Sequence, residues 1–254
     1  MDFMFMSTPP LPHQLFEAFS LTHLLTLVFI ACAAAVGLFF LERKKDERFR
    51  ARFAMALAIS IVVMETGRIA YTVFSATFSV SSSLPLHLCG IMAFMTPVAL
   101  LMRNRVLHET AFFLGISGAL QPLLTPDVLY TFPHILYIIT FYVHGALVFA
   151  GLYILVIRRF RPTLFSLLRV FLAGNGMLVV VYFFNLATGS NYMFLMGPSP
   201  NPSLIDLFIS IFGPPPLHII GFELMGMAMA GLLYFMAKAV DMVTPDIKKS
   251  SLYN

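Results

Sequence analysis

Long apolar runs alternate with short polar segments along the whole chain. Seven of these runs are long enough to cross about 30 Å of hydrocarbon as helices. They cover roughly residues 20–41, 53–74, 85–102, 109–125, 133–157, 166–187 and 215–238. No internal repeat or separable soluble part interrupts them. The pattern therefore predicts an all-α, polytopic membrane helical bundle in which residues 1–254 form a single integral membrane domain.

Basic residues occur in every second connecting segment. The segments that carry Lys or Arg are 42–52, 103–108, 158–169 and the C-terminal end. The segments that carry none are 1–19, 75–84, 126–132 and 188–214. Basic loops stay on the cytoplasmic side, so the N-terminus is predicted outside and the C-terminus inside. Of the 16 Lys and Arg residues, 15 fall on the inner side and Arg68 is the exception.

Two outer segments have distinct compositions. Residues 1–19 lack the basic start of a signal peptide and are expected to form a short apolar arm on the outer side. Segment 188–214 is too apolar for an ordinary exposed loop and ends in Gly213-Pro214-Pro215-Pro216. It is expected to form a re-entrant segment or lid before the last helix. The alternative is simple interfacial anchoring by Tyr192 and Phe194.

Composition indicates a multi-pass membrane protein, and the expected location is the inner (plasma) membrane. The chain is 59% hydrophobic and 11% charged, with a mean hydropathy of +0.87, far outside the range of soluble domains. Its net charge of +4 comes from short loops, so it does not indicate a nucleic-acid partner. The expected partners are membrane phospholipids. The sequence indicates no cofactor, and no protein partner can be inferred from it.

Polar residues within the apolar runs collect in the predicted outer half of the membrane. They are His23, Glu65, Arg68, His87, Cys89, Gln121, Thr125, His134, Thr140, His144, Asn185, His218 and Glu223. An unpartnered polar group in hydrocarbon costs several kcal/mol, so this clustering predicts a shared cavity that opens outward. Glu65 and Arg68 lie three residues apart on one helix face and are expected to form an ion pair. That pair either serves function or only fixes helix packing.

Cys89 is the candidate nucleophile. It follows Pro85, which is tolerated at a first helical position and therefore predicts a helix start about one turn before the thiol. The alternative is that Cys89 is a small buried hydrophobic residue. Cys32 lies in an alanine-rich, mid-membrane stretch and is expected to serve in packing. Two cysteines make neither a disulfide framework nor a zinc site.

A thiol needs a base within reach, and three histidines compete for that role. By helical rise Cys89 lies about 6 Å below the outer boundary and His144 about 16 Å below it. His87 and His134 are closer to Cys89 in depth, although His87 points to a different helix face. No His-x-x-x-His or Glu-x-x-His pair occurs, so no metal site is predicted. A zinc site built from His87, His134 and Glu223 is the alternative.

Several motifs resemble the YwaF-type bacterial integral membrane proteins over nearly the whole chain. They are Leu84-Pro85-Leu86-His87-Leu88-Cys89, Leu124-Thr125-Pro126, Phe141-Tyr142-Val143-His144, Asn185 with Thr188-Gly189-Ser190-Asn191-Tyr192-Met193-Phe194-Leu195, and Ser203-Leu204 through Gly213-Pro214. Eukaryotic relatives of that family are described as glycerophospholipid acyltransferases that use a cysteine and a histidine. The resemblance implies that these residues are Cys89 and His144 here. Gly213-Pro214-Pro215-Pro216 departs from the family pattern by lacking an aromatic residue.

The predicted function is a membrane lipid acyltransferase or transacylase. Cys89 would take an acyl chain from a phospholipid as a thioester, and His144 would move the proton. Asn185 or Asn191 could help to hold the oxyanion. The further supporting residues are His87, Glu65, Arg68, His134 and Tyr192. The same fold resembles androgen-induced membrane hydrolases, which use a threonine, so an acyl-ester hydrolase is one alternative. A small-solute transporter or ligand-binding protein is the other.

Overall fold

The computed structural model describes residues 15–198 and 204–243. Within these ranges the regular secondary structure is helical, and one isolated bridge joins Leu15 to Tyr130. Of the expected outer arm at residues 1–19, residues 1–14 lie outside the described residues. The elements are α1 (Leu21–Arg43), α2 (Glu47–Phe74), α3 (Leu88–Leu101), α4 (Arg105–Thr110), the π-helical turn η3 (Ala111–Gly115), α5 (Ile116–Leu124), α6 (Ile135–Val156), α7 (Leu164–Thr188), the 3-10 turn η4 (Tyr192–Phe194), α8 (Leu204–Phe212) and α9 (Ile219–Val243).

Five described helices are long and apolar enough to cross a membrane, namely α1, α2, α6, α7 and α9. The predicted run 85–102 forms the shorter apolar helix α3. The run 109–125 forms the continuous series α4, η3 and α5. The predicted all-α, polytopic membrane bundle is therefore confirmed.

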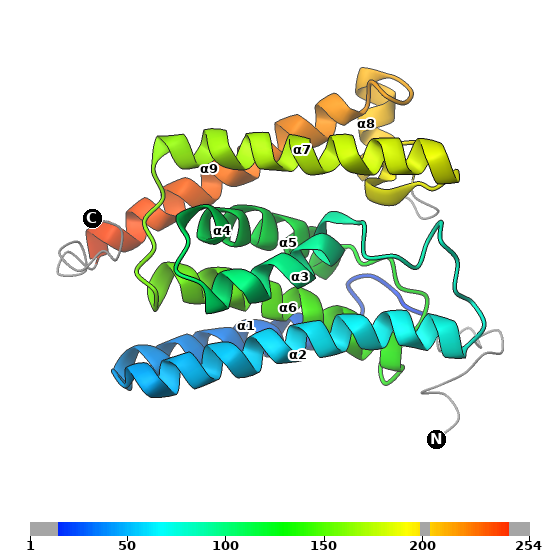
Figure 1. Cartoon of the computed structure of the whole chain (residues 1–254). Coiled ribbons are helices and arrows are strands. Elements are labelled where there is room, and N and C mark those ends of the chain that lie inside the picture. The colour runs from blue at the N-terminus through cyan, green and yellow to red at the C-terminus, as the bar shows by residue number, and fades with distance from the viewer. Residues whose placement is uncertain (1–14, 199–203, 244–254) are drawn as a thin grey trace.

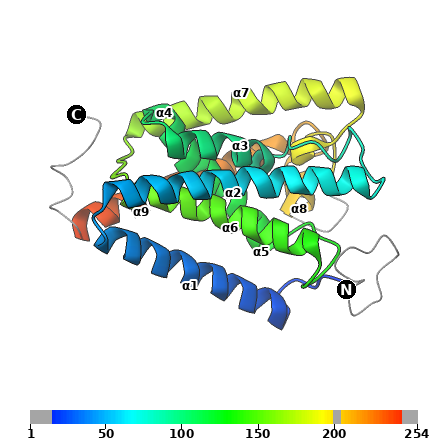
Figure 2. The same ribbon diagram turned by 60° about the horizontal axis from the view of Figure 1, so that its bottom comes forward.

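In the view of Figure 1 the helices lie in three layers, with α7 and α9 at the top, α1 and α2 at the bottom, and α3, α4, α5 and α6 between them. In Figure 2 α7 lies at the top, α1 lies at the bottom, and α2 crosses the middle of the bundle in front. Half of the most apolar stretch of α6 is buried, the largest share among the five long helices. Close approach to η3 and α5 depends on Gly151, because a Cβ there would lie 2.5 Å from Ile116.

The basic connections meet at one end of the bundle. In Figure 1 the α1–α2, α3–α4 and α6–α7 connections all lie at the end where α9 finishes. The α2–α3, α5–α6 and α7–α8 connections lie at the opposite end. We call these the inner and outer ends, following the predicted sidedness.

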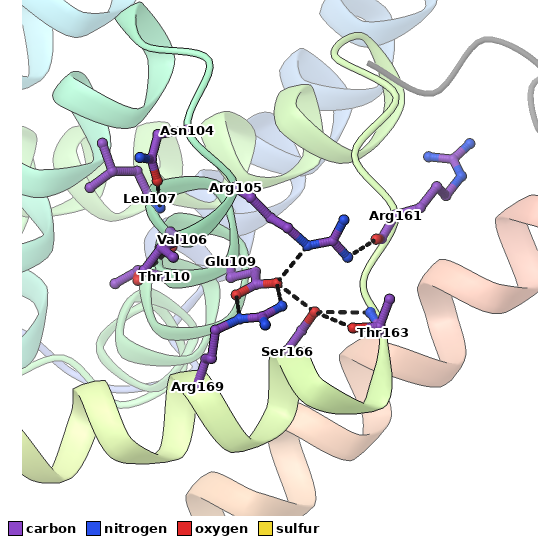
Figure 3. A network of polar contacts seen from close by, with 10 residues as sticks. All are labelled: Asn104, Arg105, Val106, Leu107, Glu109, Thr110, Arg161, Thr163, Ser166 and Arg169. Carbon is purple, nitrogen blue, oxygen red and sulfur yellow. Dashed lines mark hydrogen bonds and ion pairs between the residues drawn. The ribbon is translucent and has the colours of Figure 1, made fainter. Parts of the chain in front are cut away.

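A buried carboxylate joins α4 to α7 near the inner end (Figure 3). Glu109 is fully buried and accepts hydrogen bonds from Arg105 Nε at 3.1 Å, Arg169 Nε at 2.6 Å and Ser166 Oγ at 2.7 Å. Ser166 also forms a capping box with Thr163 at the start of α7. Sequence reasoning treated Glu109 only as the first residue of an apolar run and missed this network.

Candidate functional site

The helix that carries Cys89 begins later than predicted. Helix α3 starts at Leu88 with His87 as its N-cap, and Pro85 lies in the preceding bend. The reason is visible at Gly90, where a Cβ would lie only 2.8 Å from the Pro85 Cα. The backbone before α3 therefore folds back across Gly90 instead of continuing into the helix. Cys89 becomes the second residue of α3, closer to the helix end than expected.

This position exposes the Cys89 sulfur to backbone amides that lack intrahelical partners. The N–H groups of Cys89 and Gly90 lie close to the sulfur. Such first-turn donors favour negative charge, as does a nearby guanidinium, whereas apolar surroundings disfavour it. Cys89 is half-buried and packs against the main hydrophobic core. We therefore expect the thiol to need a base at the moment of attack.

Helix α5 lies against the start of α3. A Cβ at Gly118 would lie 3.1 Å from Leu88 Cγ and 3.6 Å from the Cys89 nitrogen. The absence of a side chain at Gly118 therefore allows α5 to pack closely against the first turn of α3, which carries Cys89. No pattern in the sequence predicts this contact, because a glycine within an apolar run has no characteristic spacing to a residue 29 positions earlier.

Glu65 and Arg68 form the ion pair that their spacing predicts. Arg68 donates from Nε at 3.0 Å and from Nη2 at 2.7 Å to Glu65 Oε1. Glu65 is 4% exposed. Arg68 Nη2 also lies 3.4 Å from the carbonyl oxygen of Ser83, just before α3. The pair thus links α2 to the segment that leads to Cys89.

Arg68 is the charged centre around which four other candidate residues gather. Its guanidinium interacts electrostatically with His87, Cys89, His144 and Tyr192. Glu65 interacts in the same way with Cys89. The supporting helices α2, α3 and α6 also contact one another pairwise. The structure therefore brings together candidates from three helices and from the segment after α7.

Hydrogen bonds distinguish the three candidate bases. His144 Nδ1 lies 2.7 Å from the Thr140 carbonyl oxygen, which can only accept, so Nδ1 carries the hydrogen. Its Nε2 then holds a lone pair, and this atom is buried without a hydrogen-bond partner in the described structure. His87 Nδ1 and His134 Nδ1 instead accept from backbone amides, at 3.2 Å in each case. In their neutral forms, Nε2 of those two rings carries the hydrogen.

Tyr192 holds the segment after α7 against the segment before α3. It is fully buried, so the alternative of interfacial anchoring by Tyr192 is wrong. Its hydroxyl donates to the Val80 carbonyl oxygen at 2.7 Å and accepts from the Leu84 amide at 2.9 Å. Burial raises the pKa of Tyr192, while the Leu84 hydrogen bond and the Arg68 charge oppose that rise.

The two asparagines support this segment through both ends of their amides. Asn185 donates to the Tyr192 carbonyl oxygen at 2.9 Å and accepts from the Tyr192 amide at 3.0 Å. Asn191 accepts from the Met196 amide at 2.9 Å and donates to the Gly197 carbonyl oxygen at 3.3 Å. Their observed bonds therefore shape the backbone between α7 and α8.

Other polar residues of the predicted outer half contact partners other than Arg68. His134 stacks on Tyr130 with ring centroids 3.9 Å apart. His23 Nε2 lies 2.9 Å from the Leu123 carbonyl oxygen, and Glu223 accepts from Asn175 at 3.2 Å. Cys32 is exposed on α1, so its expected role in packing is not found within the described part of this chain. The neighbouring Ala31, Ala33 and Ala35 are also exposed, whereas Ala34 packs against the core.

The described residues contain no group of three or more His, Cys, Asp or Glu side chains that could hold a metal ion. The zinc alternative would have combined His87, His134 and Glu223, which do not form such a group. The arrangement around Arg68 instead offers a thiol, an imidazole lone pair and a guanidinium. These are the groups used in acyl transfer through a covalent intermediate.

These features define a multi-pass helical membrane protein with a polar site near the outer end of its bundle. The chain belongs to the TMEM164 family, whose family model matches residues 18–234. Comparison with curated proteins finds no match. No solved structure matches either.

Proposed function

We propose that this protein is a phospholipid acyltransferase in which Cys89 carries the acyl chain and His144 transfers the protons. The observation that supports this most directly is the hydrogen-bond pattern of the histidines. Among the three candidate bases, only His144 combines a hydrogen-bonded Nδ1–H with a buried, unpartnered Nε2. A fixed ring with a free lone pair is what a general base for a thiol requires. The motif resemblance independently points to the same two residues.

The proposed reaction proceeds through two acyl transfers. His144 Nε2 takes the proton of the Cys89 thiol as the sulfur attacks the ester carbonyl carbon of a phospholipid. The C–O ester bond breaks, and the departing lysolipid oxygen receives that proton from Nε2. An acceptor hydroxyl then attacks the thioester and gives its proton to Nε2, while the C–S bond breaks. Nε2 finally returns a proton to the Cys89 sulfur.

Arg68 is the group proposed to stabilise negative charge in this site. It interacts electrostatically with both Cys89 and His144, and Glu65 holds it in place through two hydrogen bonds. A fixed positive charge in surroundings of low polarity favours an oxyanion or a lipid phosphate. The expected oxyanion role of Asn185 or Asn191 is less favoured, since both amides bond to backbone.

The direct test is acyl transfer by purified protein in phosphatidylcholine vesicles that contain an isotope-labelled acyl donor and a lysophospholipid acceptor. Cys89→Ala and His144→Gln should each lower the rate by about 100-fold or more. Cys32→Ala is the matched control and should stay within about twofold, because that thiol is exposed on α1. Circular dichroism and thermal unfolding of each variant establish that it remains folded.

The other outcomes separate the competing functions. Release of free fatty acid that needs Cys89 but no acceptor indicates an acyl-ester hydrolase. Solute uptake or ligand binding that survives Cys89→Ala but requires Arg68 indicates a transporter or binding protein. Acyl transfer that persists in folded Cys89→Ala contradicts the proposed intermediate.

A further inference from the structure

A second polar site lies at the inner end of the bundle. It is a cavity of about 100 Å³ lined by Glu47, Arg50, Ala51, Arg103, Tyr153, Ile157 and Arg158. Arg103 lies two residues after Leu101, the last residue of α3, whereas Cys89 lies in the first turn of that helix. Helical rise therefore separates the cavity from Cys89 by roughly 20 Å. The cavity is distinct from the proposed acyl-transfer site.

The lining of this cavity carries an excess of positive charge. Three arginines face one glutamate, which leaves two positive charges without an acidic partner in the wall. The neutralised arginine is Arg50, which is 8% exposed and bonds to Glu47 at 3.0 Å. Arg50 also donates to the Leu41 carbonyl oxygen at 3.0 Å. The uncompensated charges are therefore those of Arg103 and Arg158.

Arg158 has donor capacity that its surroundings leave unused. Its Nη2 donates to the Leu100 carbonyl oxygen at 3.1 Å, which fixes the side chain against the end of α3. Its Nε is buried and has no hydrogen-bond partner among the described residues. Arg103 is exposed and forms no recorded ion pair with the described part of the chain. A buried unsatisfied donor is costly, so it favours a ligand with acceptor oxygens.

We propose that this cavity binds the phosphate group of an anionic phospholipid in the cytoplasmic leaflet. Guanidinium groups recognise phosphate through charge-assisted hydrogen bonds, and anionic lipids concentrate in that leaflet. The volume suits a phosphate group, whereas the acyl chains would lie along the exposed apolar sides of the bundle. Arg103 and Arg158 hold the phosphate. Arg50, bonded to Glu47, shapes the wall.

The experiment measures binding of phosphatidylglycerol to the full-length protein in neutral detergent by native mass spectrometry. Phosphatidylcholine serves as the zwitterionic comparison, and glycerol 1-phosphate and inorganic phosphate serve as competitors. Arg103→Gln and Arg158→Gln should each weaken phosphatidylglycerol binding by about tenfold or more, the effect of losing a charge-assisted hydrogen bond. Arg48→Gln is the matched control, since Arg48 is an exposed arginine of α2 that does not line the cavity.

Each result decides the assignment. The site is supported if the wild-type protein prefers phosphatidylglycerol and Arg103→Gln loses that preference. Arg48→Gln should bind phosphatidylglycerol within about twofold of the wild-type protein. If the two lipids bind equally, or if Arg48→Gln weakens phosphatidylglycerol binding as much as Arg103→Gln does, the site is overturned. Binding would then reflect general attraction of anionic lipid to the basic surface. If glycerol 1-phosphate or inorganic phosphate displaces the lipid at equal concentration, the cavity binds phosphate, but the proposal that its ligand is a phospholipid is overturned. Arg103→Gln keeps the test valid if Arg158→Gln fails to fold, because Arg103 is exposed.

Discussion

Buried imidazoles in this protein mostly bond to backbone groups. His23 reaches the Leu123 carbonyl oxygen at 2.9 Å, and His218 reaches that of Phe194 at 2.9 Å. His108 lies 3.0 Å from the carbonyl oxygens of Ala99 and Met102. Backbone groups at helix ends need partners where water is excluded, and a ring nitrogen supplies one. Within the described residues, the second ring nitrogen stays buried without a hydrogen-bond partner in both His144 and His218, and of these two rings His144 is the one that interacts with Arg68.

Gly90 provides a test at the residue scale. We expect Gly90→Ala to displace the Pro85 backbone, because the added Cβ would lie 2.8 Å from it, and to lower both stability and acyl transfer. The expected destabilisation is about 1–3 kcal/mol, as for overpacking. The measurement is unfolding by SDS titration in mild detergent.

The matched control is Gly176→Ala on α7, where an added Cβ meets no atom within 4 Å. Because alanine has the higher helix propensity, Gly176→Ala should be neutral or stabilise by up to about 1 kcal/mol. A Gly90→Ala variant as stable and active as this control contradicts the packing described for the start of α3.

At the scale of elements, three hydrogen bonds fix the segment after α7 to the segment before α3 and to the start of α9. Tyr192 bonds to the segment before α3, Met193 donates its amide to His87 at 3.2 Å, and His218 reaches the Phe194 carbonyl oxygen. Met193 and Phe194 adopt positive φ values of 55° each. Such backbone conformations persist when surrounding contacts over-determine them. The segment is therefore expected to be rigid where it covers the site.

Removal of one hydroxyl tests this attachment. Tyr192→Phe leaves the Val80 carbonyl oxygen and the Leu84 amide without that partner, so we expect faster amide hydrogen exchange in segments 80–88 and 189–195. The corresponding loss of stability is about 1–3 kcal/mol.

Tyr182→Phe on α7 is the matched control, since the Tyr182 hydroxyl has no recorded hydrogen bond within the described residues. It should leave exchange in both segments unchanged. If the amides of both segments exchange at the same rate in Tyr192→Phe and Tyr182→Phe, the Tyr192 hydroxyl does not hold the segment after α7 in place.

Sequence patterns predict the helices well but their polar contacts only in part. Apolar length locates α1, α2, α6, α7 and α9, and the spacing of Glu65 and Arg68 gives their ion pair. Both signals are local. The late start of α3 depends on how Pro85 crosses Gly90, and the Glu109 network joins residues about 60 positions apart. Such contacts arise from packing between elements, which no local spacing encodes.

At the scale of the whole molecule, the Glu109 network fixes α4 to α7 inside the bundle. Its carboxylate is fully buried and balanced by two arginines. We expect Glu109→Gln to destabilise the protein by about 1–3 kcal/mol, because two partly exposed arginines lose charge-assisted hydrogen bonds. Glu17→Gln, an exposed position, should change stability by less than about 0.5 kcal/mol. Equal unfolding midpoints in SDS titrations would show that the network does not stabilise the bundle.

The predicted sidedness is tested by labelling in intact cells. In a background carrying Cys32→Ser and Cys89→Ser, Ser81→Cys between α2 and α3 should react with a membrane-impermeant maleimide. Lys45→Cys between α1 and α2 should react only after the membrane is opened. Both positions are exposed, so accessibility of the side chain does not differ between them. The reverse labelling pattern contradicts the assignment of inner and outer ends.

The central claim is that Cys89 carries the acyl chain. The most direct measurement is the intact mass of the purified protein after incubation with phospholipid donor in the absence of acceptor. The account predicts added mass of one acyl chain on Cys89, removed by neutral hydroxylamine, absent in Cys89→Ala and strongly reduced in His144→Gln. An enzyme that transfers acyl chains between lipids without any acyl group on Cys89, or that does so after Cys89→Ala, contradicts it.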